Sequence, residues 1–184
     1  MKTSTKSTGK TSFVPPAVSK VSVGKLKARA EAFIKQLGLD YPDLKFEPGN
    51  QEHWSPRSKT VTYNLNQPLR DLRYGVLHEL AHALLEHADY SNDFELLKLE
   101  TDAWDMASDI GHRYHIEIGS EHIQNCLDTY RDWLHRRSTC PSCSMHVLQK
   151  NSSSYHCFNC QTTWNVSTGR FVRPYRRKQK LSAS

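Results

Sequence analysis

A His-Glu-x-x-His motif lies near the middle of the chain, at His78, Glu79 and His82. On an α-helix, residues four apart lie about 40° apart around the axis, so the two imidazoles would leave one face, one turn apart. Two nitrogen ligands would then reach one metal ion. Glu79 lies about 100° round from His78, at the rim of that face, where a carboxylate can reach a water molecule on the metal. The motif therefore predicts a zinc site with Glu79 as the general base.

Zinc-assisted hydrolysis explains why these residue types are needed together. Zinc held by neutral nitrogens lowers the pKa of its bound water to roughly 7, and a neighbouring carboxylate can accept the proton as the water attacks a carbonyl. A surface helix with a chance pattern is the alternative. Against it, buried histidines and glutamates are costly unless they are coordinated or paired. The apolar residues that would bury this helix are Leu77, Leu80, Ala81, Leu84 and Leu85.

A third protein ligand is expected from a second helix over residues 94–110. Glu100 shares a face there with the small or apolar residues Ala103, Trp104 and Ala107. An isolated glutamate on such a face needs a partner, and the metal held by His78 and His82 is the best one available. Glu100 is therefore the predicted third ligand.

His87 is the rival for that role. It lies roughly 180° from His78 and 140° from His82 on an ideal helix, so a break would be needed to bring it to them. No glycine is present to provide the break. The second helix is followed by His112, Tyr114 and His115, and each of these residues is a candidate for stabilising an oxyanion.

Two Cys-x-x-Cys pairs near the C-terminus predict a second metal site. Cys140 and Cys143 are separated from Cys157 and Cys160 by 13 residues. Four thiolates on two tight turns complete a closed tetrahedral zinc site with no position for water. A module this small needs the metal to fold. A redox dithiol is the alternative, and the pairing of two knuckles argues against it; Cys126 is left over as a small apolar residue.

The charge of +6 is unevenly distributed along the chain. Residues 89–109 contain seven acidic residues and one basic residue, Lys98. The C-terminal tail is basic, which suggests a contact with nucleic acid or another polyanion, a solubilising tail being the alternative. The basic residues of the tail are Arg170, Arg173, Arg176, Arg177, Lys178 and Lys180.

No apolar run is long enough to span a membrane, and the N-terminus lacks the apolar core of a signal peptide. We therefore expect a cytoplasmic protein without a membrane partner. Five cysteines arranged as two pairs and one single residue fit a reducing compartment with metal better than a disulfide framework.

The expected fold class is α+β, with a small appended zinc ribbon. Residues 1–22 are predicted to be disordered, 23–137 to form the catalytic domain, 138–168 the ribbon and 169–184 the basic tail. Within the domain, a first helix is expected over residues 25–37, ending at Gly38. Residues 44–65 alternate like a small antiparallel sheet, whose edge can pair with an extended substrate or can simply cover the helices. A last helix is expected from Ser120 to about Arg137.

The motif segments 78–85 and 99–104 resemble the ImmA/IrrE family of metallopeptidases, within a likeness that covers about residues 25–118. Members carry His-Glu-x-x-His and a downstream Glu-x-[Glu/Asp]-Ala helix that provides the third ligand, matched here by Glu100, Asp102 and Ala103. The resemblance implies a minimal zincin-like metallopeptidase domain that cuts a regulatory protein, such as a DNA-bound repressor. The C-terminal ribbon and the lack of an obvious helix-turn-helix depart from the family pattern.

Two alternatives remain open. SprT-like proteases, which act near DNA, have a similar layout with a C-terminal zinc ribbon, but they take a third histidine, and no His-Gly-x-x-Phe-like segment follows here. A non-catalytic zinc protein that binds nucleic acid through its ribbon would use the first site for structure alone. Glu79 counts against that alternative, because it is badly placed as a ligand and well placed as a base.

Overall fold

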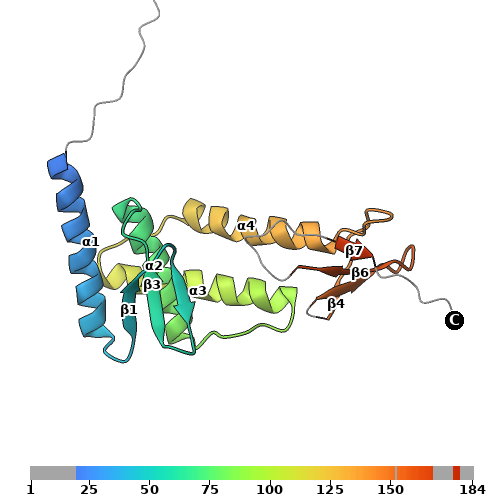
Figure 1. Ribbon diagram of the computed structural model, residues 1–184, viewed down its shortest axis with the longest axis horizontal. Helices are drawn as coiled ribbons and strands as arrows, with labels where there is room; N and C mark the ends of the chain where they lie inside the picture. The colour runs from blue at the N-terminus through green and yellow to red at the C-terminus, as the bar shows by residue number, and fades with distance from the viewer. Residues whose placement is uncertain (1–19, 152, 168–175, 179–184) are drawn as a thin grey trace, which may run out of the picture.

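The computed structural model describes residues 20–151, 153–167 and 176–178 and shows an α+β protein. In Figure 1, helices and a small sheet form one end of the molecule, and α4 leads to a second small sheet at the other end. The elements in chain order are α1 Lys20–Asp40, β1 Lys45–Pro48, β2 His53–Ser55, β3 Thr60–Tyr63, α2 Leu69–Leu84, α3 Asp93–Arg113, α4 Ser120–Ser138, β4 Gln149–Asn151, β5 Ser154–His156, β6 Thr163–Val166 and β7 Arg176–Lys178.

Helix α1 is longer at both ends than the sequence pattern predicts. It begins at Lys20, so residues 20–22, assigned to a disordered segment, are helical; residues 1–19 of that segment lie outside the described residues. The helix also continues through Gly38 to Asp40. Leu37 is fully buried in the core, and Gln36 donates a 2.9 Å hydrogen bond to Asp40. These contacts offset the cost of a glycine in a helix, which is about 1 kcal/mol.

The first sheet is mixed rather than antiparallel, which corrects the prediction from the alternating pattern. Its strand order is β1-β3-β2. Strands β2 and β3 form an antiparallel hairpin, whereas β1 pairs with β3 in parallel. The hairpin turn contains Lys59 in the left-handed region, with φ 50°. Because β3 occupies the centre, β2 becomes an edge strand, and that edge faces α2.

Helices α2 and α3 pack together at the centre of the core. Pro68 precedes α2 as its N-cap residue, as expected for a proline at a helix start. Small side chains on the facing surfaces allow the two backbones to approach closely. The fully buried residues of the two helices include Leu72, Val76, Leu77, Leu80, Ala81, Ala103, Ala107 and Ile110. This interface positions His78 on α2 and Glu100 on α3.

The second sheet has the strand order β4-β5-β6-β7. Tyr155 on β5 and Trp164 on β6 stack with ring centroids 5.4 Å apart and form the core of this module together with Val166. Strand β7 was not predicted from the sequence, which assigned its residues to the basic tail. It pairs antiparallel with β6 and so covers the edge that β6 would otherwise expose. The tail residues Arg170, Arg173 and Lys180 lie outside the described residues.

A charged pair between the buried Arg137 and the half-buried Asp93 attaches the second sheet to the helices. Arg137, near the end of α4, is 1% exposed, and its guanidinium lies 3.5 Å from Asp93 and over the ring of Trp133. Tyr155 donates its hydroxyl hydrogen to the same aspartate, and the indole of Trp164 donates to the carbonyl of Arg137 at 3.0 Å. The sheet is therefore fixed to the start of α3 and the end of α4.

Within the described residues, each helix is too short or too polar to cross a lipid bilayer. The cellular location remains a prediction from the sequence.

We expect Gly111→Ala to lower the melting temperature. A Cβ atom at this position would lie 2.6 Å from the carbonyl oxygen of Ile116, a backbone atom that cannot rotate away. Overpacking costs roughly 1–3 kcal/mol, which exceeds the gain in helix propensity of about 1 kcal/mol. Gly24→Ala is the matched control in α1, where nothing lies within 4 Å, and should leave the melting temperature unchanged or raise it. Equal thermal unfolding of the two variants would contradict this account.

Candidate metal centre

Helices α2 and α3 bring the three predicted ligands of the first site together. Nε2 of His78 lies 3.1 Å from Oε2 of Glu100 and 3.1 Å from Nε2 of His82. The distance from Nε2 of His82 to Oε2 of Glu100 is 3.8 Å. His78 and Glu100 are buried, and His82 is half-buried. Two nitrogens and one carboxylate oxygen thus converge on one point.

The spacing of these atoms fits a zinc ion. Nitrogen and oxygen ligands lie about 2.0–2.2 Å from zinc, so neighbouring ligands in a tetrahedron are about 3.3–3.5 Å apart. The observed separations of 3.1 to 3.8 Å bracket that value. Three protein ligands leave one position open, which is the arrangement of a catalytic rather than a structural zinc site.

Burial and hydrogen bonding act in opposite directions on the carboxyl group of Glu100. Burial raises the pKa of its carboxyl group, but hydrogen bonds from His78 and His82 outweigh burial and hold that pKa well below its usual value. The two histidines thus favour the charged form of this carboxyl group, which is the form that binds a cation.

His78 is oriented by packing. Its ring stacks on Trp104 with centroids 4.2 Å apart and an interplanar angle of 24°. Its outer nitrogen, Nδ1, is buried and has no hydrogen-bond partner in the part of the chain that the structure describes. The sequence placed Trp104 on the face of Glu100, and the structure shows that the same residue also supports a histidine.

The expectation that His87 cannot reach the other histidines is wrong for His82. Helix α2 ends at Leu84, and Glu86 adopts a left-handed φ of 55° without being a glycine. The chain therefore turns back, and Nδ1 of His87 lies 2.8 Å from Nδ1 of His82. Burial and the neighbouring His82 lower the pKa of His87. His87 lies behind His82 and outside the group of converging ligand atoms.

Glu79 points towards strand β2. Its Oε2 accepts a 2.7 Å hydrogen bond from the backbone N–H of Trp54. The indole N–H of the same tryptophan donates to the carbonyl oxygen of His87 at 3.0 Å. The sequence predicts only that Trp54 lies in the sheet, because contacts between segments so far apart leave no local signal.

An open cleft of about 500 Å³ contains the candidate base and two of the ligands, Glu79, His82 and Glu100. The cleft is lined by the segment of β2 and by residues of α3 and α4. The apolar lining residues from α3 and α4 are Leu96, Leu99 and Tyr130. Tyr114, one of the open candidates for oxyanion stabilisation, instead donates its hydroxyl hydrogen to Asp40 at 2.6 Å, which gives it a structural contact with α1.

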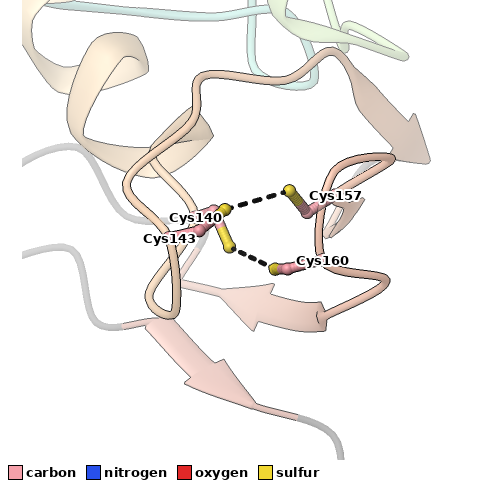
Figure 2. A group of neighbouring side chains, drawn as sticks. All are labelled: Cys140, Cys143, Cys157 and Cys160. Atoms are coloured by element: carbon pink, nitrogen blue, oxygen red, sulfur yellow. Dashed lines mark hydrogen bonds between the residues drawn. The ribbon is translucent and has the colours of Figure 1, made fainter.

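The four cysteines of the second site also converge, as Figure 2 shows. The Sγ atoms of Cys140 and Cys160 are 3.5 Å apart, and those of Cys143 and Cys157 are 3.5 Å apart. Thiolates bound to zinc at about 2.3 Å would lie about 3.8 Å from one another. The cluster therefore fits a closed tetrahedral site.

The two cysteine knuckles have the same backbone geometry. The residue after each pair, Ser144 or Gln161, is left-handed with φ 62°, and its N–H bonds back to the carbonyl of the first cysteine of its pair. The hydroxyl of Thr162 lies 3.2 Å from Sγ of Cys160, and its side-chain and backbone hydrogen bonds lower the pKa of Cys160 to about 6. These contacts favour the thiolate form of Cys160, which is the form that binds a metal.

Comparison of the chain with protein-family models, with curated proteins and with solved structures gave no match. The histidine–glutamate cluster and the cysteine cluster differ in the type and number of their ligands. Three mixed ligands beside an open cleft suit catalysis, and four thiolates in a closed site suit folding.

Glu100→Gln should remove one zinc ion from the chain. The neutral amide is a poor ligand, so we expect zinc content after dialysis to fall from about two ions per chain to about one, with the cysteine site still filled. Asp105→Asn, an exposed carboxylate on the same helix, is the matched control and should keep both ions. Elemental analysis measures the content. Full zinc content in Glu100→Gln, combined with loss in His87→Ala, would show that the third ligand is misassigned.

Proposed function

We propose that this chain is a zinc-dependent metallopeptidase with a minimal zincin-like fold. One observation carries the proposal: His78 and His82 from α2 converge with Glu100 from α3 beside an open cleft that also contains Glu79. The protein substrate would be a regulatory protein, as the resemblance to the ImmA/IrrE metallopeptidases implies. A SprT-like protease would share the chemistry but not the glutamate ligand.

Each residue of the site has a distinct task in this proposal. His78, His82 and Glu100 would hold the zinc, which would supply Lewis-acid polarisation of the scissile carbonyl and a lower pKa for water. Glu79 accepts the proton of the attacking water and delivers it to the leaving amine. The N–H of Trp54 keeps the Glu79 carboxylate at the wall of the cleft until then.

Strand β2 favours an extended peptide as the substrate. In an antiparallel pair, a residue whose N–H points away from its partner strand also directs its carbonyl outward. Trp54, opposite Val61, donates its N–H to Glu79 and so presents its carbonyl to the cleft side. Two residues further on, Pro56 has no N–H to donate. The edge therefore offers an acceptor, which suits a substrate that donates its own backbone N–H.

The cleft lining from α3 and α4 favours an apolar side chain near the cleaved bond. Leu96 is buried, and Leu99 and Tyr130 are half-buried beside Glu100. An apolar or aromatic substrate side chain would cover these residues and exclude water from the site.

We also propose that the cysteine sheet, as a zinc ribbon, binds nucleic acid and brings the peptidase to substrates there. Arg176, Arg177 and Lys178 form the edge strand β7 and are all exposed. Phe158, within the second knuckle, is 78% exposed. Cations can contact phosphates, and an exposed aromatic ring can stack on an unpaired base. This combination favours nucleic acid over a purely solubilising tail.

Replacing the proposed base tests the catalytic assignment. Glu79→Gln should lower the cleavage rate of an unfolded protein substrate about a hundredfold or more, because proton transfer is lost, while zinc content stays unchanged. Glu47→Gln, an exposed carboxylate on β1, is the control and should cleave at the wild-type rate. Removing the zinc with a chelator should abolish cleavage by the wild type and by the Glu47→Gln control. Unchanged turnover in Glu79→Gln would exclude this mechanism, and a wild type without metal-dependent cleavage would favour a non-catalytic zinc protein.

The proposed nucleic-acid contact should weaken as salt rises. The logarithm of the affinity for duplex DNA falls with the logarithm of salt concentration by about 0.9 per phosphate neutralised. Because β7 completes the sheet, substitution is a better test than deletion. Arg177→Gln with Lys178→Gln should reduce that slope, and Lys35→Gln on α1 should not. Fluorescence anisotropy with labelled single- and double-stranded oligonucleotides measures the affinity of each variant at several salt concentrations. Wild-type protein without salt-dependent binding would mean that the ribbon is a structural or protein-docking module.

A further inference from the structure

The two ring nitrogens of His82 face different partners. Its Nε2 lies 3.1 Å from Nε2 of His78 and 3.8 Å from Oε2 of Glu100, inside the ligand cluster. Its Nδ1 lies 2.8 Å from Nδ1 of His87, on the outer side. The rings of His82 and His87 are inclined at 66°, with centroids 5.0 Å apart, so they meet through their nitrogens rather than by stacking.

The chemistry of imidazole determines which nitrogen carries the proton. A neutral histidine that binds a metal through Nε2 carries its hydrogen on Nδ1. Nδ1 of His82 is then the donor, and Nδ1 of His87 is the acceptor, so the hydrogen of His87 lies on its Nε2. The opposite tautomer of His82 would direct a hydrogen into the ligand cluster, at the position where the metal is needed.

His87 is held in place from several directions. Glu86 takes a left-handed conformation, which is unfavourable for a residue other than glycine and persists only where the surroundings enforce it. The backbone N–H of His87 donates to the carbonyl of His82 at 2.9 Å. The indole of Trp54 donates to the carbonyl of His87 at 3.0 Å. The turn is thus fastened both to α2 and to strand β2.

The two histidine ligands are supported differently. The Nδ1 of His78 has no hydrogen-bond partner among the described residues, and its ring rests on Trp104. Among the described residues, His82 has a hydrogen-bonding group, His87, at its outer nitrogen, whereas His78 has none. The loss of His87 should therefore affect one ligand selectively.

We propose that His87 is a positioning residue for the metal ligand His82. It accepts the Nδ1 hydrogen of His82 and so directs the Nε2 lone pair of His82 into the cluster. Trp54 links this support to the base, because its indole N–H holds His87 while its backbone N–H holds Glu79. The inference rests on the proposed function only in taking zinc as the bound metal.

The test measures the zinc affinity of the first site in the full-length chain, with the cysteine site already filled. His87→Ala should weaken binding about 10- to 100-fold, which is the usual effect of losing the outer partner of a metal-bound histidine. His87→Asn should restore binding to within about threefold of wild type, because its amide oxygen can accept the same hydrogen. His135→Ala, an exposed histidine near the end of α4, is the matched control and should bind as wild type does.

A second measurement tests the tautomers directly. In the zinc-loaded protein, nitrogen-15 NMR of the imidazoles should show the hydrogen of His82 on Nδ1 and that of His87 on Nε2. Trp54→Phe, which keeps the backbone N–H and removes the indole donor, should weaken zinc binding while the metal-free protein still unfolds cooperatively.

Three outcomes would overturn the proposal, and they separate it from the peptidase assignment. Wild-type affinity in His87→Ala would exclude a positioning role and leave the peptidase proposal intact. Equal weakening in His87→Ala and His87→Asn would show that packing of the turn matters and the hydrogen bond does not. A wild-type chain that binds zinc only at the cysteines would overturn both proposals.

Discussion

The carboxylate of Glu100, buried between α2 and α3, is the constraint on which the rest of the domain depends. A buried charge is tolerated only where partners compensate for the lost water, and here two imidazoles supply them. Satisfying that charge requires His78 and His82 on one face of a helix and Glu100 directly opposite. Alanines at the helix interface let the backbones approach closely enough for this. The core is thus built around a polar centre.

The small mixed sheet contributes to that centre through one edge strand. Trp54 is buried. Its backbone N–H donates a hydrogen bond to Glu79, and its indole N–H donates one to the carbonyl oxygen of His87. The base and one histidine ligand are therefore held by the same residue of β2. Any movement of this edge, such as pairing with an extended peptide, would reach both groups. This connection makes strand β2 part of the site as well as a cover for the helices.

The cysteine sheet is coupled to the same helices. Asp93 is the first residue of α3 and lies two turns before Glu100. Its carboxylate accepts a hydrogen bond from the hydroxyl of Tyr155 and forms an ion pair with Arg137. Burial raises the pKa of Asp93, while the bond from Tyr155 and the charge of Arg137 oppose that rise. Removing Asp93 would leave the buried guanidinium of Arg137 without its charged partner, which is destabilising. Folding of the cysteine sheet therefore supports the helix that carries Glu100.

Local sequence determined the parts of this protein that depend on periodicity and spacing. The four-residue step from His78 to His82, the lone glutamate on the apolar face of α3 and the paired cysteine knuckles all follow from geometry within one turn or one helix. Tertiary structure alone decided the parallel pairing of β1, the return of His87 to His82, the double contact of Trp54 and the addition of β7. These features join segments far apart in the chain, or depend on a left-handed residue that is not glycine, as at Glu86. Their energies come from contacts that exist only after the core has formed, so no local pattern encodes them.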